Sequence, residues 1–217
     1  MIAHDMRTPL NALRLGIQAA KTAQDPKALQ SSLELAERNI KALSDLVESL
    51  VDLSIQGKCE LSLRPVLPSD LVASAIIQIK PMAEQKSVTI MAKEADLPPL
   101  IADGSRLIRV LVNLLSNAVR FSPLNESIVV DAKARSNDGH EVVVFSVSDD
   151  GPGVPSSDID RIFVAGVSIS NSGASSNGLG LAVCKEIVEA HGGRIWVETG
   201  KAHGATFSFS IPQTSRW

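Results

Sequence analysis

Residues 2–53 carry apolar side chains at the spacing of two long amphipathic helices. The first run has them three or four residues apart, as one helix face requires: Ile2, Met6, Leu10, Leu13, Ile17 and Ala20. Residues 24–26 (Gln-Asp-Pro) interrupt the pattern, because proline suits the start of a helix but not its interior. A second run follows with the same spacing: Leu29, Leu33, Ala36, Ile40, Leu43, Val47, Leu50 and Leu53. Such a hairpin exposes an apolar stripe that one copy cannot bury, so we expect two copies to form a four-helix bundle in a homodimer.

The composition changes after Gly57, where short runs of strand character alternate with helices. We therefore divide the chain into a helical hairpin (1–56), a linker (57–64) and a second domain (65–217). Ser69 is predicted to cap a helix, and Pro81 to end or bend it. A sheet covered by helices on one face is predicted, which makes the fold α+β. Strands are predicted at 61–66, 88–91, 100–101, 127–134, 141–147, 194–198 and 205–211, and helices after residue 69, at 103–120 and at 179–190.

Composition and charge argue against several classes of function. The net charge of −3 disfavours binding to nucleic acid or anionic membranes by charge alone, and the aromatic content of 3% disfavours a base-stacking surface. No run approaches the ~18 apolar residues of a membrane span. Cys59 and Cys184 lie in no disulfide or metal-ligand pattern, which favours a reducing, cytoplasmic setting. If the full protein senses a signal, the sensing part would lie upstream, outside this chain, anchored in a membrane or not.

Residues 4–10 (His-Asp-Met-Arg-Thr-Pro-Leu) place a histidine among unusual neighbours. A lone histidine on a helix is most often a surface residue. Here His4 lies between two inward-facing apolar positions and is expected to project from the side of the bundle. Asp5 can keep one ring nitrogen protonated and leave the other as a nucleophile. Thr8 lies one turn further on the same helix face, and Pro9 is expected to bend the helix.

A second motif places two amides one turn apart on a predicted helix. Asn113 and Asn117 share one face, while apolar residues fill the other faces. Two solvated asparagines are the ordinary interpretation of such a pair. Amides beside so much apolar surface nevertheless need a polar partner, and a Mg²⁺ ion that bridges phosphates is one, because the amide oxygen is a hard ligand. Arg120 can then pair with a phosphate.

Two glycine-rich turns complete the set of motifs. Asp149 stands at a strand end before Gly151 and Gly153, which let the backbone turn sharply and approach a ligand. The carboxylate can accept a hydrogen bond from an exocyclic amine, although an ordinary turn explains this short pattern equally well. Residues 178–180 (Gly-Leu-Gly) open a helix, and free amides at a helix start bind phosphate. Residues 164–177 are rich in Ser, Gly and Ala and carry no charge, so a mobile loop is predicted there.

The order of these motifs resembles the Bergerat ATP-binding fold of histidine kinases, type II topoisomerases, mismatch-repair ATPases and one chaperone family. The Asn box, the Asp-x-Gly-x-Gly turn, Ile162-Phe163, the loop and the Gly-Leu-Gly-Leu helix follow one another as they do in that fold. Residues 4–10 resemble, at every position, the phospho-acceptor box of histidine kinases, His-Glu/Asp-x-x-Asn/Thr-Pro-Leu. Together the motifs resemble the catalytic core of a sensor histidine kinase of a two-component system.

The resemblance implies a second domain of the Bergerat α/β sandwich type, with ATP and Mg²⁺ as cofactors. Asn117 would bind Mg²⁺, Asn113 would support the phosphates, and Asp149 would read the adenine amine. The first glycine turn would line the base pocket and the second would shape the phosphate turn. The residues implied to bind nucleotide are Asn113, Asn117, Arg120, Asp149, Gly151, Gly153, Gly178, Leu179 and Gly180.

The resemblance also implies a reaction and a partner. His4 would take the γ-phosphoryl group of ATP, Asp5 would steady the imidazolium, and the group would pass to an aspartate on the receiver domain of a response regulator. Thr8 would position a water for the reverse dephosphorylation, which implies a phosphatase activity towards the regulator. Whether phosphorylation occurs within one subunit or across the dimer stays open, because the hand of the turn at 24–26 is not fixed by composition.

The sequence bears differently on two alternatives to a histidine kinase. Hydrolysing relatives place a glutamate where Asn113 stands, and an amide cannot take a proton from water at neutral pH, which disfavours a plain ATPase. A dimeric signalling scaffold with a degenerate ATP site stays open. It is favoured by Val164 or Gly166 where the family usually has a second Phe, by Ser176 in place of a glycine, and by a loop without basic residues.

Overall fold

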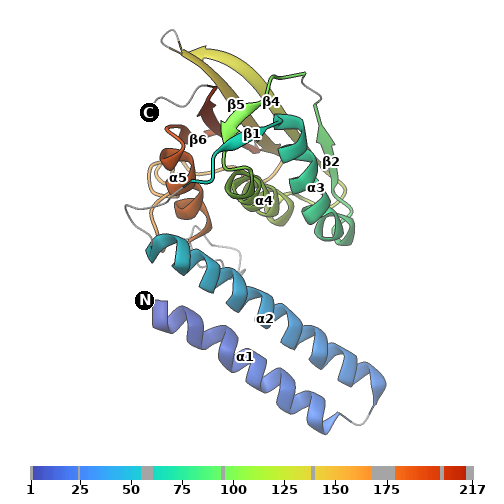
Figure 1. The fold of residues 1–217 in the computed structure, drawn as a ribbon. Coiled ribbons are helices and arrows are strands. Elements are labelled where there is room, and N and C mark those ends of the chain that lie inside the picture. Colours follow the sequence, from blue (N-terminus) through green and yellow to red (C-terminus); the bar gives the residue numbers. More distant parts are fainter. Residues whose placement is uncertain are drawn as a thin grey trace.

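The computed structural model describes the chain except for residues 1, 24, 55–60, 94–95, 138–139, 168–178, 201–202 and 214–217. The side chains of residues 2–9, 38, 41–42, 44–54, 137 and 140 are also outside the description. Two long helices come first, α1 (Ile2–Thr22) and α2 (Pro26–Ser54), and a mixed α/β domain follows. Figure 1 shows the helical hairpin and the domain as two bodies, and they meet where α2 contacts α5.

The turn between α1 and α2 forms as the sequence predicts. Asp25 caps α2, because its Oδ1 accepts a hydrogen bond from the amide of Ala28 at 2.8 Å. Pro26 occupies the first helical position, where its missing N–H costs nothing. The two helices approach closely at Gly16, where a Cβ atom would lie 3.3 Å from the carbonyl oxygen of Ser32. The antiparallel hairpin is therefore confirmed, and α1 continues as a helix through Pro9.

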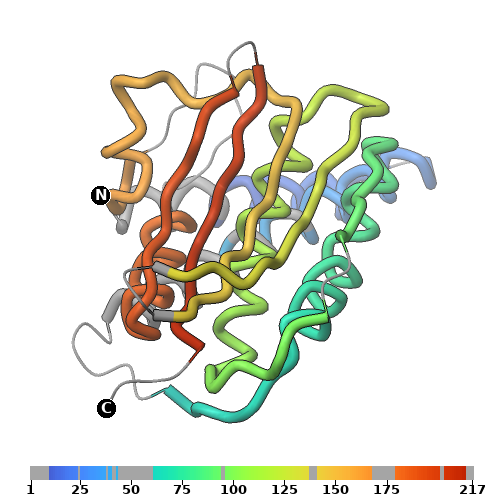
Figure 2. Tube along the Cα trace, turned by 90° about the horizontal axis from the view of Figure 1, so that it is seen from above, coloured from blue at the N-terminus to red at the C-terminus, as the bar shows by residue number. Residues whose placement is uncertain are grey.

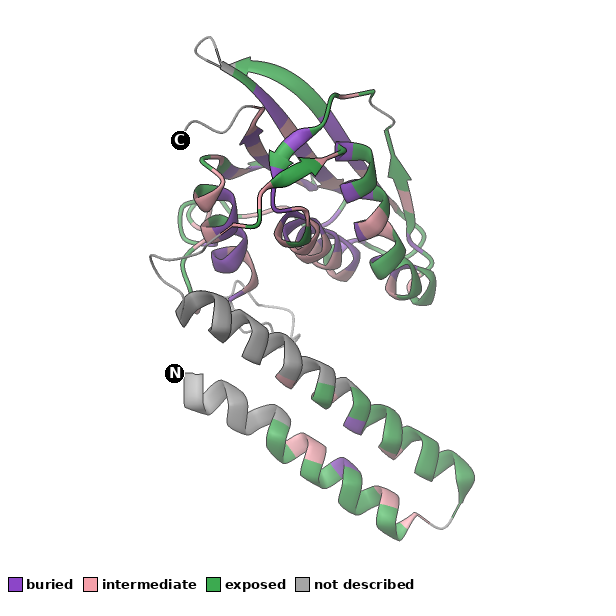
Figure 3. Cartoon of the chain, in the orientation of Figure 1, coloured by how far each residue is buried: buried purple, intermediate pink, exposed green. Residues whose placement is uncertain are grey.

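The hairpin leaves much of its apolar surface in contact with water. Figure 3 shows most of its described residues as exposed. Among them, Ala36 is the one apolar residue beyond glycine that is buried within the single chain. Exposed apolar side chains lie along both helices: Leu10, Leu15, Ile17, Leu29, Leu33, Leu35 and Ile40. All of these except Leu15 and Leu35 belong to the apolar stripe on which the prediction of a homodimer rests, and the homodimer itself stays a prediction.

The second domain contains a five-stranded sheet with the strand order β2-β4-β5-β7-β6. The β2–β4 pair is parallel, and the other neighbouring strands of this sheet are antiparallel. Two short strands, β1 and β3, form a separate antiparallel pair. The elements are β1 (Arg64–Val66), α3 (Pro68–Gln85), β2 (Thr89–Ala92), β3 (Leu100–Ala102), α4 (Gly104–Phe121), β4 (Ser127–Asn137), β5 (His140–Asp149), α5 (Gly180–Ala190), β6 (Arg194–Thr199) and β7 (Ala205–Pro212).

Helices α3, α4 and α5 cover one face of the sheet, as predicted (Figures 1 and 2). The alternation along β5 explains why: Val143, Phe145 and Val147 point into the core and are fully buried. Phe145 stacks on Phe209 of β7, with ring centroids 4.9 Å apart. The α+β fold class is confirmed. Within the described residues, no helix is both long and apolar enough to cross a bilayer.

The start of α3 differs from the sequence-based expectation, and Pro81 does not end the helix. Ser69 does not cap the helix; Pro68 begins α3, and the cap position is Leu67, which forms no side-chain cap. The fixed φ of proline starts the helix without a capping hydroxyl. Pro81 lies inside α3, which continues to Gln85. Pro81 and Ile77, one turn before it, are both exposed, so the proline ring lies on the side of α3 that faces away from the core.

Candidate nucleotide-binding site

Helix α4 presents the predicted Asn box on its partly exposed face. Seven residues of α4 are buried against the sheet and α3, and this fixes the rotation of the helix about its axis. Asn113, Asn117 and Arg120 therefore lie together on the remaining face. The side-chain amide of Asn117 donates to Oδ1 of Asn113, with a nitrogen–oxygen distance of 3.4 Å. The two amides are thus held side by side, partly buried, as the sequence predicts.

The first residue of α5 lies directly against the Asn box. A Cβ atom at Gly180 would lie 2.6 Å from Nδ2 and 2.7 Å from Oδ1 of Asn113, closer than such contacts occur in proteins. A larger residue at position 180 would therefore displace the Asn113 amide or the start of α5. Leu179 is buried and has no side-chain oxygen to cap α5, so the amides of the first helical turn stay available to an anion. Gly178 lies outside the described residues, and so does most of the predicted loop.

Asp149 ends β5 in a buried position and turns the chain sharply. Its Oδ1 accepts a hydrogen bond from the amide of Gly151 at 2.8 Å. Burial raises the pKa of Asp149, and the neighbouring charge of Asp150 raises it further, while hydrogen bonds from the amides of Gly151 and Ala205 act in the opposite direction. Each carboxylate oxygen has two lone pairs, so the group keeps acceptor capacity beyond the hydrogen bonds from these two amides. It can accept a hydrogen bond from a ligand.

The glycines after Asp149 are required by close approaches of other segments. A Cβ atom at Gly151 would lie 3.0 Å from the carbonyl oxygen of Phe121, at the end of α4. Gly153 has a φ of +75°, in the region that favours glycine, and packs against Thr199 and Gly204 of the β6–β7 turn. The end of β5 is therefore brought against the end of α4. The predicted base-binding turn and the predicted metal-binding helix share one site.

A buried hydroxyl group near this contact lacks a hydrogen-bond partner. Ser122 follows Phe121 and is 1% exposed, yet its Oγ has no partner among the described residues. Unsatisfied buried polar atoms are rare, and they commonly mark a place for a ligand or a bound water. Together with the glycine cradle and the free amides of α5, this fits a polar ligand that carries phosphates.

The residues present also fit Mg²⁺ held jointly by protein and nucleotide. Among the described residues no group of three or more His, Cys, Asp and Glu side chains could hold a metal ion alone. Mg²⁺ commonly binds through few protein oxygens together with substrate phosphates and waters. Asn117 would supply such an oxygen, and Asn113 would support the phosphates beside Gly180.

Two residues near the site were missed by sequence reasoning. Lys86 donates from Nζ to the carbonyl oxygens of Val119 and Arg120, at 2.9 and 2.7 Å. Its positive charge offsets the partial negative charge of the unpaired carbonyls at the end of α4. His191 directly follows the predicted helix at 179–190. It also accepts a hydrogen bond from the amide of Asp103 at 3.0 Å. Neither contact has a sequence signal, because the partners are far apart in the chain and lie at helix ends.

The predicted phospho-acceptor residues belong to the other body of the molecule. His4, Asp5 and Thr8 lie in the first turns of α1, and their side chains are outside the description. Figure 1 shows the start of α1 beside the end of α2, the end of the hairpin nearer the domain. The roles of these three residues stay predictions, as do those of the nucleotide-binding residues.

Comparison with known proteins decides the family. The model for the histidine kinase-, DNA gyrase B- and HSP90-like ATPases matches residues 102–215, and the model for the His kinase A phospho-acceptor domain matches residues 1–58. The chain belongs to the sensor histidine kinases. It comprises the two parts of a catalytic core, the helical phospho-acceptor hairpin and the ATPase-type domain.

Named relatives are sensor kinases of greater length. The adaptive-response sensory kinase SasA of Synechococcus sp. (strain CC9311) is 34% identical to this kinase core over 216 residues, which are 98% of this chain and 55% of that protein. SasA of Synechocystis sp. (strain PCC 6803) is 30% identical over 223 residues, 98% of this chain and 57% of that protein. The kinase core therefore spans a little over half the length of these relatives.

Two solved structures share the fold over nearly the whole kinase core. Full-length ShkA, crystallised in complex with AMPPNP, aligns with a TM-score of 0.74 and 32% identity, over 98% of this chain and 45% of that chain. The histidine kinase ThkA, in complex with the response regulator protein TrrA, aligns with a TM-score of 0.77 over 99% of this chain and 60% of that chain. Its identity of 24% shows a likeness of fold.

Proposed function

We propose that this kinase core transfers the γ-phosphoryl group of ATP to His4 and then to an aspartate on the receiver domain of a response regulator. The observation that carries the proposal is the contact of Gly180 with Asn113, which joins a free helix start to an amide pair at one site. ShkA was crystallised with AMPPNP, and ThkA with a response regulator, which supports the same ligand and partner class here. A cytoplasmic location, where ATP is available, belongs to this proposal.

The nucleotide would lie with its base at Asp149 and its phosphates at the start of α5. Asp149 accepts from the exocyclic amine of adenine, and Gly151 and Gly153 leave room for the ring. Asn113 and Gly178 to Gly180 hold the phosphates, and Arg120 pairs with one of them. Mg²⁺ bound through Asn117 would offset the negative charge of the phosphates. Because an amide at position 113 cannot act as a base, the site does not activate water, and ATP persists until another nucleophile arrives.

The proposed nucleophile is a ring nitrogen of His4. It attacks the γ-phosphorus in line, a nitrogen–phosphorus bond forms, the bond from the γ-phosphorus to the bridging oxygen breaks, and ADP leaves. Asp5 keeps the other ring nitrogen protonated and steadies the imidazolium. Thr8 would position a water for dephosphorylation of the regulator. The exposed stripe of the hairpin supports a homodimer. Helix α2 ends at Ser54 and β1 begins at Arg64, which supports a linker between them, and Arg64, the last residue of the predicted linker at 57–64, belongs to β1.

The first test is the chemistry of the label. The chain is incubated with Mg²⁺ and γ-labelled ATP, and label on the protein is challenged with acid and with base. Acid-labile, base-stable label is expected, because that is the behaviour of a phosphorus–nitrogen bond in phosphohistidine. Nucleotide binding without label would instead support the scaffold with a degenerate ATP site. That alternative rests on Val164, Gly166 and Ser176, of which Ser176 lies outside the described residues.

Replacing Asp149 with asparagine is expected to weaken ATP binding by about tenfold to a hundredfold, the range for a hydrogen bond to a charged group. The one acceptor oxygen of asparagine is needed by the Gly151 amide, which leaves an NH2 group facing the adenine amine. The matched control is Asp150→Asn, which changes the exposed neighbour by the same atoms and should leave affinity nearly unchanged. Titration calorimetry with AMPPNP and Mg²⁺ measures both. Equal affinities for the two variants would show that Asp149 does not read the base.

The affinity is also expected to fall with acidification through Asp149. Burial raises the pKa of this carboxyl group, so it becomes protonated at a higher pH than a solvated aspartate. The ionised form is the better acceptor for the adenine amine, and it is the form present above the raised pKa. As the pH falls through that value, Asp149 loses its charge and ATP binding weakens. The free energy of unfolding of the domain increases over the same range, because a buried charge is removed.

A further inference from the structure

Helices α4 and α5 lie side by side, and each end of α5 contacts α4 or its cap residue. At one end Gly180, which begins α5, lies against Asn113 in the middle of α4. At the other end His191, which follows α5, accepts a hydrogen bond from the amide of Asp103, which caps α4. At 1.5 Å per residue these contacts are separated by about 15 Å along α4 and about 16 Å along α5. The two helices are therefore antiparallel and fixed to each other at matched intervals, and one of the two contacts is the nucleotide site.

Both ring nitrogens of His191 are engaged, and this determines its state. Nδ1 lies 2.7 Å from the carbonyl oxygen of Ile187. A carbonyl only accepts, so Nδ1 carries the proton and donates. Nε2 then has the lone pair that accepts the Asp103 amide at 3.0 Å. Only the neutral ring in this tautomer satisfies both partners, because protonation would place an N–H at Nε2 against the N–H of Asp103.

Asp103 connects the same point to the segment that arrives from the hairpin. Its Oδ2 accepts a hydrogen bond from the backbone amide of Ser62 at 3.1 Å, across 41 residues of sequence separation. Its Oδ1 accepts from the hydroxyl of Ser105 at 2.6 Å and from the amide of Arg106 at 3.2 Å. One buried aspartate thus holds the start of α4, the end of α5 and the chain just before β1.

We propose that His191 is a positioning residue for the nucleotide site: through Asp103 it fixes the register of α5 on α4, ties that register to the segment at Ser62, and releases both when its ring is protonated. The proposal rests on the proposed ATP site at Asn113 and Gly180. A shift of α5 along α4 at the His191 end moves Gly180 relative to Asn113, since a helix transmits displacement along its axis. The phosphates would then meet a displaced helix start.

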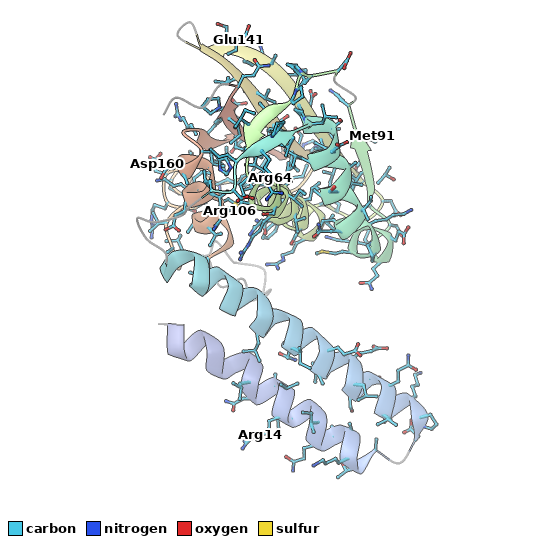
Figure 4. All side chains as sticks on the ribbon, in the orientation of Figure 1. Arg14, Arg64, Met91, Arg106, Glu141 and Asp160 are labelled. Atoms are coloured by element: carbon cyan, nitrogen blue, oxygen red, sulfur yellow. The ribbon has the colours of Figure 1, made fainter. Side chains whose placement is uncertain are left out.

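The charged groups around the ring define the pH range of the release. Burial lowers the pKa of His191, the charge of Arg106 lowers it further, and the carbonyl of Ile187 and the charge of Asp103 oppose the change. Figure 4 shows Arg106 on the side of the domain that faces the hairpin. Within α5, Lys185 and Glu189 pair with each other at 3.8 Å, and Arg194 at the start of β6 is exposed.

The sign of the effect follows from the lowered value. A group whose pKa is lower in the folded protein contributes stability that is complete above its unfolded pKa, about 6.5 for histidine, and that is lost as the pH falls through the folded value. The hydrogen bonds that join α4, α5 and Ser62 through His191 and Asp103 are therefore intact at neutral pH, and they are lost at pH values below 6.5.

The test measures AMPPNP binding in the presence of Mg²⁺ by calorimetry between pH 5 and 8, using the whole chain. His191→Leu removes both hydrogen bonds and should weaken binding at neutral pH by about tenfold, as expected for an amide left without a partner. His191→Gln supplies a carbonyl for Asp103 and an amide for Ile187 but does not titrate. It should bind like the wild type at pH 7.5, and the ratio of its dissociation constant to that of the wild type should fall on acidification. Taking this ratio cancels the titration of the nucleotide and of Asp149.

Controls separate positioning from general stability. Lys185→Gln, an exposed change on α5, should follow the wild-type pH profile throughout. A His191→Leu variant that melts earlier but binds AMPPNP normally well below its melting temperature would overturn the proposal, as would a constant wild-type to His191→Gln ratio. Failure of the wild type to bind AMPPNP would instead refute the proposed function.

The connection to Ser62 has its own readout. Ser62→Pro removes the backbone N–H that donates a hydrogen bond to Asp103, and this substitution should weaken AMPPNP binding by a few-fold. In combination with His191→Leu the two effects should be less than additive, because both act through Asp103. Strictly additive effects, or no effect of Ser62→Pro on binding, would show that the segment at Ser62 is not tied to the nucleotide site.

Discussion

Replacing His4 with glutamine is expected to abolish phosphoryl labelling of the protein while nucleotide binding stays unchanged. Glutamine is polar and fits a helix, but its amide nitrogen has no lone pair free to attack phosphorus. The label should therefore fall to the background level, because the loss of the nucleophile is complete and not partial. The nucleotide site is built from α4, α5 and the end of β5, in the other body of the molecule, so affinity for AMPPNP should be that of the wild type.

The matched control for this experiment is a second histidine in the same chain. His140 begins β5, and Asp149 ends it, so about 30 Å of strand separate His140 from the proposed base pocket. His140→Gln should keep full labelling. Persistent label on His4→Gln, or loss of label in both variants, would contradict the assignment of His4. Mapping the acid-labile site by proteolysis of labelled protein gives an independent measurement.

Replacing Gly180 with alanine is expected to weaken nucleotide binding by at least about tenfold without lowering the melting temperature. The new Cβ atom would lie within 2.7 Å of two atoms of the Asn113 amide, so either Asn113 or the start of α5 must move. Both would hold the phosphates. Alanine favours a helix over glycine by about 1 kcal/mol, which offsets the cost of that movement in stability. A loss of affinity with stability retained is therefore the signature of this variant.

Gly16→Ala is the control for the same substitution outside the domain. It adds a methyl group at the close approach of α1 and α2, where the nearest atom is 3.3 Å away, and it should leave affinity for AMPPNP unchanged. If Gly180→Ala binds as tightly as the wild type, the contact between Gly180 and Asn113 does not belong to the nucleotide site. Calorimetry and thermal unfolding on the three proteins are sufficient to decide.

Helix positions in the domain were predictable where one signal was unopposed. Helix α4 was predicted at 103–120 and occupies Gly104–Phe121, because Asp103 caps it and its apolar face is continuous. The predicted start of α3 was wrong, because a helix-starting proline and a capping serine stand next to each other. Pro68 begins the helix, so Ser69 lies inside it and does not cap it. Strand β4 extends to Asn137, beyond the predicted end, because its polar last residues pair with β5 without an apolar pattern.

The site could be predicted as a set of residues but not as an arrangement. The order of the motifs indicated the family, and the structure brings Asn113, Asn117, Gly180 and the turn after Asp149 together. The contacts that hold this arrangement join residues that no local pattern relates: 88 positions separate His191 from Asp103, and 33 or 34 separate Lys86 from the carbonyl oxygens it binds. Such pairs depend on how whole helices pack, which periodicity alone does not specify.

The exposed apolar stripe of the hairpin has a consequence for how the molecule unfolds. In the proposed homodimer each hairpin buries these side chains against the second copy, so folding and association form one equilibrium and the midpoint of unfolding rises with protein concentration. The α/β domain has its own core and its unfolding is independent of concentration. On dilution the melting temperature of the helical hairpin would therefore fall, while that of the α/β domain stays constant. The phospho-acceptor helices would then unfold at a lower temperature than the domain that carries the nucleotide site.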